Sequence, residues 1–172
     1  LSANNEATLF MTLQTAFAIL LSKESRENDI VIGTPIANRP HEDLAPLIGF
    51  FANSLVLRNQ LEGRLSFNES LSQARKMILQ AFENQQVSFD MLVDTLQPDR
   101  DLSVTPIFQV IFALNQSANT GQLDLPGLTL KTIDNPTTVA KTDIGMFINE
   151  SDEGLEVNWE YCTELFEAAR VF

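Results

Sequence analysis

The hydrophobic positions near the start of the chain repeat with helical spacing. Apolar side chains recur every three or four residues at Phe10, Leu13, Phe17 and Leu20. Further apolar residues lie between them, so this pattern predicts a helix that is buried on most sides. Asn5 precedes the repeat and has a side chain that commonly caps helices, so we expect the helix to begin there.

Two short apolar runs that follow have the composition of strands. Residues 30–32 are β-branched and predict an interior strand. Residues 34–40 contain two prolines and predict a loop. Residues 48–58 predict a second strand that is apolar on both faces, as in a sheet covered on two sides.

Two helices and a third strand are expected next. Ser66 and Glu69 have the spacing of a capping box, which predicts a helix that ends near Asn84. Ser88 can cap a shorter helix that stops before a proline. Residues 107–114 form a strong apolar run and predict an interior strand.

The last part of the chain alternates polar and apolar segments. Residues 115–127 are polar and predict a loop or excursion, and residues 128–133 predict a strand. Residues 143–149 and 155–161 flank a turn sequence and predict a hairpin. Thr163 can cap a final helix. This order predicts an α/β or α+β fold, with a mixed sheet and helices packed on it.

Composition narrows the classes of partner. The chain has 172 residues, and we expect residues 1–172 to form a single domain. The net charge of −12 argues against nucleic acid and anionic membranes, although a local basic patch is compatible with it. One cysteine excludes an internal disulfide. With no long apolar stretch and no signal-peptide pattern, we expect a cytoplasmic protein.

The sequence holds no self-contained catalytic constellation. His41 could act as a general base, but no neighbouring group in the sequence would orient it, which favours a solvated loop histidine. Cys162 is flanked by acidic residues that disfavour a thiolate, which favours an inert thiol. Arg100 and Asp101 lie in a stretch without a calcium-loop pattern, and more simply form ion pairs or caps.

Asn53 and Ser54 are the most informative polar residues. They interrupt an otherwise apolar strand, where unpaired polar groups would be costly. Their side chains either bond to nearby backbone or face a tunnel or pocket, and the sequence leaves both alternatives open.

Five segments, in order along the chain, resemble motifs of the condensation domains of nonribosomal peptide synthetases. They resemble the family patterns VVGTPxAGR, IGxFVNT…R, HQDVPFE, RDxSRxPL and YNTDLF. In this chain they are residues 31–39 (VIGTPIANR), 48–58 (IGFFANSLVLR), 84–90 (NQQVSFD), 100–106 (RDLSVTP) and 161–166 (YCTELF). The departures from these patterns are Ala52 for Val, Ser54 for Thr, Asn84 for His, Gln86 for Asp, Ser88 for Pro and Val104 for Arg.

The resemblance implies that this chain is the C-terminal lobe of a two-lobed fold related to chloramphenicol acetyltransferase. In that family the active site lies in a tunnel between two lobes. Donor and acceptor arrive on the phosphopantetheine arms of carrier proteins and are joined by a peptide bond. The family's catalytic motif, HHxxxDG, lies in the preceding lobe and is absent here. The resemblance therefore implies that this chain has no catalytic residue, metal or cofactor of its own.

The resemblance also implies roles for individual residues. It places Gly33, Thr34 and Pro35 on a loop near the tunnel floor, and Asn53 and Ser54 on the inner strand. Residues 115–127 become the candidate for an excursion that crosses over the other lobe. Structural roles in the motifs are expected for Gly49, Arg58, Gln85, Phe89, Arg100 and Asp101.

Two other functions fit the same resemblance. The domain could be a non-catalytic module that docks carrier proteins, or half of an ester-forming acyltransferase. Residues 48–58 are more similar to ordinary peptide-bond-forming domains than to epimerisation or heterocyclisation domains. The chain also starts without Met, so we expect it to be a fragment whose uncovered lobe interface causes self-association.

Overall fold

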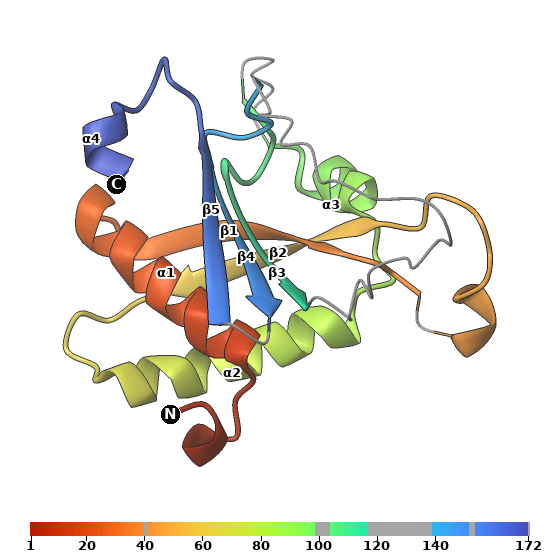
Figure 1. Ribbon diagram of the computed structural model, residues 1–172, viewed down its shortest axis with the longest axis horizontal. Helices are drawn as coiled ribbons and strands as arrows, with labels where there is room; N and C mark the ends of the chain where they lie inside the picture. Colours follow the sequence, from red (N-terminus) through yellow and green to blue (C-terminus); the bar gives the residue numbers. More distant parts are fainter. Residues whose placement is uncertain (40, 99–103, 117–138, 152–153, 172) are drawn as a thin grey trace, which may run out of the picture. The chain divides into compact units, whose positions relative to one another are not determined.

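The computed structural model describes residues 1–39, 41–98, 104–116, 139–151 and 154–171. The chain divides into two compact units, Leu1–Phe112 and Ala113–Phe172. Figure 1 labels the helices and strands of each unit. Strand β3 (Val110–Gln116) crosses the division, so each unit contains part of it.

The first helix of the N-terminal unit begins later than its sequence suggested. Asn5 ends a short 3-10 helix, η1 (Ala3–Asn5), and α1 (Leu9–Ser25) follows. The cap is Thr8, whose Oγ1 accepts a hydrogen bond from the backbone N–H of Met11 at 3.2 Å. The expectation that Asn5 caps this helix was wrong, because Thr8 satisfies the free amide.

The strands of the N-terminal unit form a mixed sheet, as predicted. β1 (Asp29–Ile36) and β2 (Asn53–Gln60) are antiparallel, and every residue of β1 has a partner in β2. β3 lies on the other side of β1 and runs parallel to it, with Gly33 opposite Ile111. The order in this unit is β2-β1-β3, so β2 is an edge strand.

The structure corrects three expectations about these strands. Residues 34–36 belong to β1 rather than to a loop, because the extended geometry favoured before a proline is also that of a strand. β2 begins at Asn53 and not at Ile48, which is fully exposed. β2 is also buried on one face only, where Leu55 and Leu57 lie.

The two middle helices begin where their caps predicted. Ser66 and Glu69 form the full capping box of α2 (Phe67–Glu83). The Oγ of Ser88 accepts a hydrogen bond from the backbone N–H of Met91 at the start of α3 (Phe89–Leu96). These local signals depend on residues three apart, so the sequence alone identifies them.

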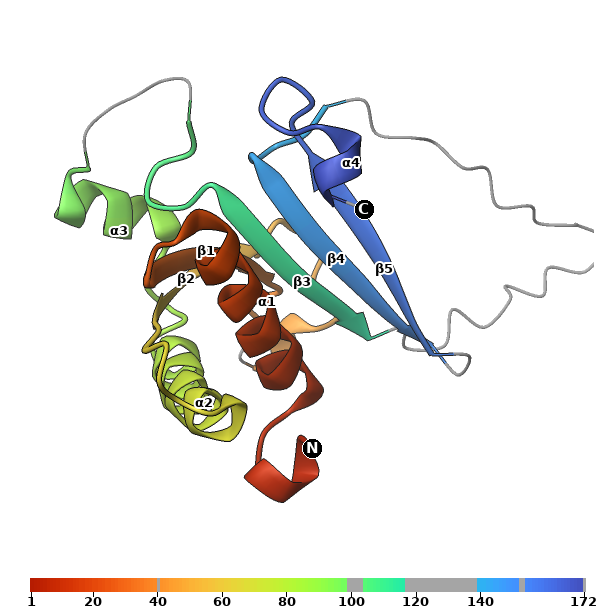
Figure 2. The same ribbon diagram turned by 90° about the vertical axis from the view of Figure 1, so that its left-hand side faces the viewer.

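One face of β1 and β2 packs against α1 and α2 (Figures 1 and 2). We call it the helix-covered face. Its core comprises Met11 of α1, Leu55 and Leu57 of β2, and Leu71, Ala74 and Ile78 of α2. Leu57, Leu71 and Ile78 are fully buried, which identifies the helix–sheet interface as the core of this unit.

The C-terminal unit contains the predicted hairpin. β4 (Ile144–Ser151) and β5 (Gly154–Tyr161) pair antiparallel along their whole length, in the order β3-β4-β5. Thr163 lies in a turn and does not cap α4 (Ala168–Val171), so that expectation was wrong. The predicted strand at 128–133 lies outside the described residues.

We expect Gly33→Ala to lower the free energy of unfolding by about 1–3 kcal/mol, because a Cβ there would overlap the ring of Phe108. Phe108 is buried and cannot easily move away. Chemical denaturation would measure the loss. Gly63→Ala is the matched control, since a Cβ at Gly63 has nothing within 4 Å. Equal stability of the two variants would contradict the prediction.

Candidate functional site

The pairing of β1 with β2 places two of the predicted tunnel residues on the helix-covered face. Directly opposed residues of an antiparallel pair share a face, and side chains alternate along each strand. Thr34 lies opposite the core residue Leu55 and is itself 3% exposed. Asn53 lies opposite Ile36, which packs against the same core. Thr34 and Asn53 therefore point towards the helices.

The other three predicted tunnel residues lie on the opposite side, which we call the second face. It carries Gly33, Pro35 and Ser54, with Pro35 directly opposite Ser54. Pro35 is exposed and Ser54 is half-buried, whereas Gly33 is covered by Phe108. All three are in strands, so the expected floor loop at Gly33, Thr34 and Pro35 is a strand segment.

The side-chain amide of Asn53 is fully hydrogen-bonded to backbone. Its Nδ2 donates to the carbonyl oxygens of Gln85 and Val87 at 3.0 and 2.8 Å. Its Oδ1 accepts from the backbone N–H of Phe89 at 3.1 Å. These contacts correspond to the first alternative left open by the sequence, and they connect the start of β2 to the turn between α2 and α3.

An aromatic pair extends this connection. The rings of Phe89 and Phe108 lie 5.2 Å apart between centroids, at 55° to each other. The ring of Phe108 occupies the space beside Gly33 that a side chain would need. The segments around Gly33 and Phe89, which resemble separate family motifs, therefore meet at Phe108, and Asn53 is joined to them through the backbone N–H of Phe89.

The loop between β1 and β2 is organised by Arg39, a residue that the sequence analysis did not single out. Its guanidinium donates to the carbonyl oxygens of Leu44, Leu47 and Gly49, and lies 4.3 Å from the centre of the Phe51 ring. A Cβ at Gly49 would approach that ring to 3.0 Å. The aromatic residues that follow Arg39 in the sequence could have suggested a cation–π contact. The sequence gives no signal for the carbonyl oxygens that Arg39 binds.

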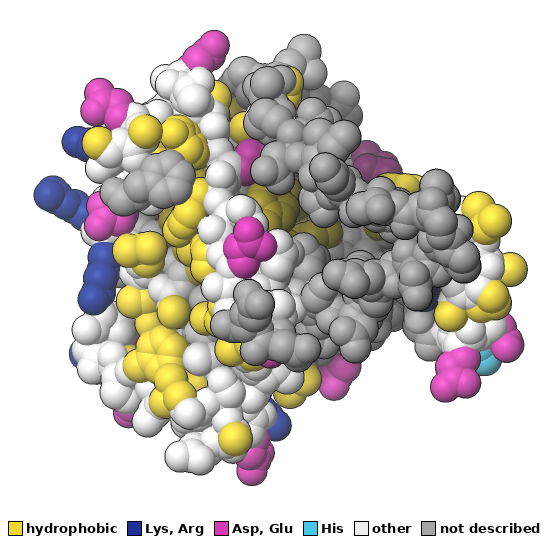
Figure 3. Space-filling view, viewed as in Figure 1, with side chains coloured by type: hydrophobic (Ala, Val, Ile, Leu, Met, Phe, Trp, Pro, Cys, Tyr) yellow, Lys and Arg dark blue, Asp and Glu magenta, His cyan; other side chains and the backbone are white. Residues whose placement is uncertain are grey.

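The same loop exposes large apolar side chains. Ile48 and Phe50 are 104% and 92% exposed, and Leu47 is 49% exposed. We call these three residues the loop tip. His41, just before η2 (Glu42–Leu44), lies 3.4 Å from a carboxylate oxygen of Asp43, and both side chains are largely exposed. Figure 3 shows hydrophobic side chains beside this histidine at the edge of the molecule.

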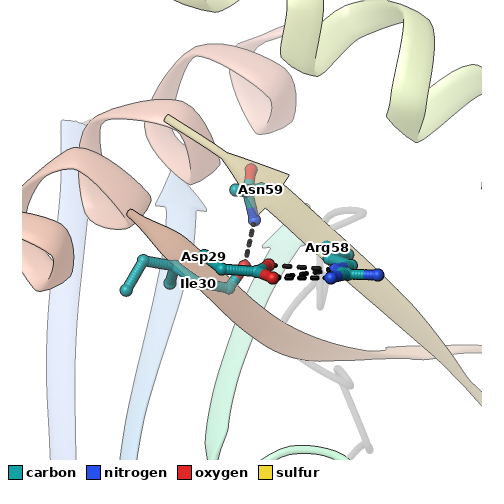
Figure 4. A network of polar contacts seen from close by, with 4 residues as sticks. All are labelled: Asp29, Ile30, Arg58 and Asn59. Carbon is teal, nitrogen blue, oxygen red and sulfur yellow. Dashed lines mark hydrogen bonds and ion pairs between the residues drawn. The ribbon is translucent and has the colours of Figure 1, made fainter. Parts of the chain in front are cut away.

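Arg58 joins the two strands on the second face. Its Nε and a terminal nitrogen donate to the carboxylate of Asp29 at 2.7–3.1 Å (Figure 4). This hydrogen-bonded ion pair lowers the pKa of Asp29 and raises that of Arg58. The pair links β1 to β2, and the structural role that the resemblance implies for Arg58 stays a prediction.

Other predicted site residues have simple surroundings or lie outside the described part. Cys162 is a free, half-buried thiol. Gln85 contributes its backbone carbonyl to Asn53. Arg100, Asp101 and residues 117–127 of the expected excursion are outside the described residues, while residues 115 and 116 belong to β3.

The described residues contain neither a metal-binding cluster nor a membrane-spanning helix. No group of three or more His, Cys, Asp or Glu side chains lies close enough to hold a metal ion. Among the described helices, none has the length and apolar character needed to cross a membrane.

Comparison with known proteins identifies relatives over nearly the whole chain. A family model described as Condensation domain matches residues 1–171. Malpinin synthetase from Mortierella alpina is 40% identical over 171 residues, covering 99% of this chain and 2% of that protein. Bacitracin synthase 3 from Bacillus licheniformis is 36% identical, covering 99% of this chain and 3% of that protein. The chain thus spans a small fraction of these relatives.

Solved structures share the fold. A four-domain nonribosomal peptide synthetase, holo-AB3403 bound to AMP and glycine, matches with a TM-score of 0.89 and 25% identity, over 98% of this chain and 14% of that chain. The X-domain from teicoplanin biosynthesis matches with a TM-score of 0.86 and 24% identity, over 98% of this chain and 39% of that chain. The second likeness is one of fold alone.

We expect Arg58→Gln to lower the melting temperature near pH 7 and to have a smaller effect in acid. Asp29 has a folded-state pKa below its ordinary value of 3.8, so the ion pair stabilises the fold above that pH. This stabilisation is lost as the pH falls through the folded pKa. Thermal unfolding at about pH 7 and about pH 2.5 would measure the difference.

Arg64→Gln is the control for this experiment. Arg64 pairs with Glu62, two residues away, and so does not hold two strands together. An effect of Arg58→Gln that is equal at the two pH values would contradict the assignment.

Proposed function

The chain belongs to the condensation domain family, and on that premise we propose that it is the C-terminal lobe of a domain that forms peptide bonds in nonribosomal peptide synthesis. The observation that carries this proposal is the family match over residues 1–171, together with relatives that are peptide synthetases. The acceptor amine attacks the donor thioester carbon, a C–N bond forms and the donor arm leaves as a thiol.

The contribution of this lobe is positioning rather than acid–base chemistry. HHxxxDG is expected in the preceding lobe, and this chain contains no such motif. The second face provides small side chains at Pro35 and Ser54, where a thin phosphopantetheine arm could approach the backbone, whereas Gly33 is covered by the ring of Phe108. Holding two tethered reactants in reacting geometry can supply much of the rate acceleration.

The partners in this proposal are the preceding lobe and the donor and acceptor carrier proteins. The exposed loop tip supports the first of these, because large apolar side chains seldom remain fully exposed in an assembled protein. The net charge of −12 argues against a broad basic docking surface. Carrier docking would therefore take place through local and partly apolar contacts. A cytoplasmic location stays a prediction.

A docking module without catalysis is the second candidate. The X-domain from teicoplanin biosynthesis, which shares this fold, has also been solved in a complex with OxyB. At 24% identity this likeness concerns the fold alone, so it shows that such a fold can serve as a binding partner. The third candidate, an ester-forming acyltransferase, needs the same histidine motif and a hydroxyl acceptor.

We expect the full-length protein to join an aminoacyl donor to an aminoacyl acceptor when both carriers are loaded. Mass spectrometry of the acceptor arm would detect the dipeptidyl thioester. Changing the second histidine of the upstream HHxxxDG to alanine is the control and should abolish the product. Loaded carriers that bind but give no product would favour the docking module, and product only with a hydroxyl acceptor would favour the ester-forming acyltransferase.

We expect the isolated chain to self-associate through the loop tip. Light scattering should give a mass above that of the monomer, and the double variant Ile48→Ser, Phe50→Ser should shift it towards the monomer. Leu165→Ser is the control, because Leu165 is 60% exposed but lies outside the loop tip. A wild-type chain that stays monomeric at high concentration would contradict this prediction.

A further inference from the structure

Helix α3 is attached to the rest of its unit by few contacts. Although it is strongly amphipathic in sequence, none of its residues is buried, and Met91 and Leu96 are each 58% exposed. A helix of eight residues is too short to be stable without tertiary contacts. The three hydrogen bonds to Asn53 and the ring contact of Phe89 therefore have a large part in fixing where α3 begins.

Asparagine suits this attachment better than related side chains do. Two N–H donors meet the carbonyl oxygens of Gln85 and Val87, and one oxygen meets the N–H of Phe89. A carboxylate would lose both donors, and a serine or alanine would not reach all three groups. Backbone groups left without a partner at such a partly buried position would be costly.

The segment that carries Phe108 is constrained independently. Ile107 has a φ of 71°, a conformation that is rare for a β-branched residue. The backbone N–H of Phe108 donates to the carbonyl oxygen of Pro106 at 2.9 Å, which closes a tight γ-turn around Ile107. Such strained backbone persists only where surrounding contacts hold it. The Phe89–Phe108 pair is one of those contacts.

Asn53 acts from the side of the sheet opposite to Ser54. Its side chain lies on the helix-covered face, whereas Ser54 lies on the second face with Gly33 and Pro35. Asn53 can therefore influence the second face only through other residues. The connection runs from its amide to Phe89, from the Phe89 ring to Phe108, and from Phe108 to the backbone at Gly33.

We propose that Asn53 is a positioning residue, whose amide fixes the start of α3 and, through the Phe89–Phe108 pair, the backbone of β1 at Gly33 on the second face. This inference rests on the proposed function, in which the second face is a wall of the substrate tunnel. It assigns Asn53 a role through the α2–α3 turn in place of direct contact with a substrate arm.

The test compares Asn53→Ala with Ser54→Ala in the full-length protein. Hydrogen exchange read by mass spectrometry should show amide exchange in peptides over residues 86–92 rising about tenfold or more in Asn53→Ala and remaining unchanged in Ser54→Ala. Steady-state kinetics should show kcat for peptide-bond formation falling about tenfold or more in Asn53→Ala. The KM for the carrier should change little, because in this proposal Asn53 acts through the protein's own backbone and not by contact with the carrier.

The pH dependence of kcat in Asn53→Asp provides a second test. The introduced carboxylate faces two carbonyl oxygens, with the acidic groups Glu83 of α2 and Asp90 of α3 on the adjoining elements, so it favours protonation. When protonated it regains one O–H donor. The kcat of Asn53→Asp relative to wild type should therefore rise as the pH is lowered, whereas the relative kcat of Asn53→Ala should not.

The outcomes separate this inference from the proposed function. Suppose that the wild-type protein forms peptide bonds. The positioning role would then be overturned if Asn53→Ala left amide exchange over residues 86–92 unchanged. It would also be overturned if exchange became faster while kcat stayed the same. A wild-type protein that forms no peptide bond would overturn the proposed function and the positioning role with it. If Asn53→Ala does not fold, Phe108→Leu tests the same connection while keeping an apolar side chain, and an unchanged kcat would again overturn the role.

Discussion

The antiparallel pairing of β1 with β2 is the constraint on which the rest of the N-terminal unit depends. Side chains alternate along a strand with a period of two, so a slip of one residue would exchange the two faces. In the observed register Ile32 and Leu57 meet in the core, whereas Gly33 and Ser54 lie on the second face. The same register therefore determines both the core and the set of residues that lie on the second face.

Polar contacts on both faces specify this register. On the helix-covered face, Gln14 of α1 donates to Asn59 of β2 at 3.0 Å, and Asn59 donates to the carbonyl oxygen of Ile30 at 3.2 Å (Figure 4). On the second face, Asp29 and Arg58 form their ion pair. A slipped register would leave buried amides without partners, and that cost favours one alignment over its neighbours.

Three residues within the family-like motifs make architectural contacts. Asn53 binds the turn before α3, Arg39 holds the loop between β1 and β2, and Arg58 ties two strands together. These contacts support the proposed function, in which this lobe supplies geometry and the preceding lobe supplies the reacting groups.

The sequence by itself determined the features that depend on near neighbours. The capping box at Ser66 and the hairpin made by residues 144–161 were predicted because their signals lie within a few residues of each other. The start of β2 at Asn53 and the distribution of the predicted tunnel residues over two faces were decided by the tertiary structure. Both depend on strand pairing between distant segments and on Arg39 holding the intervening loop, and no local pattern encodes those contacts.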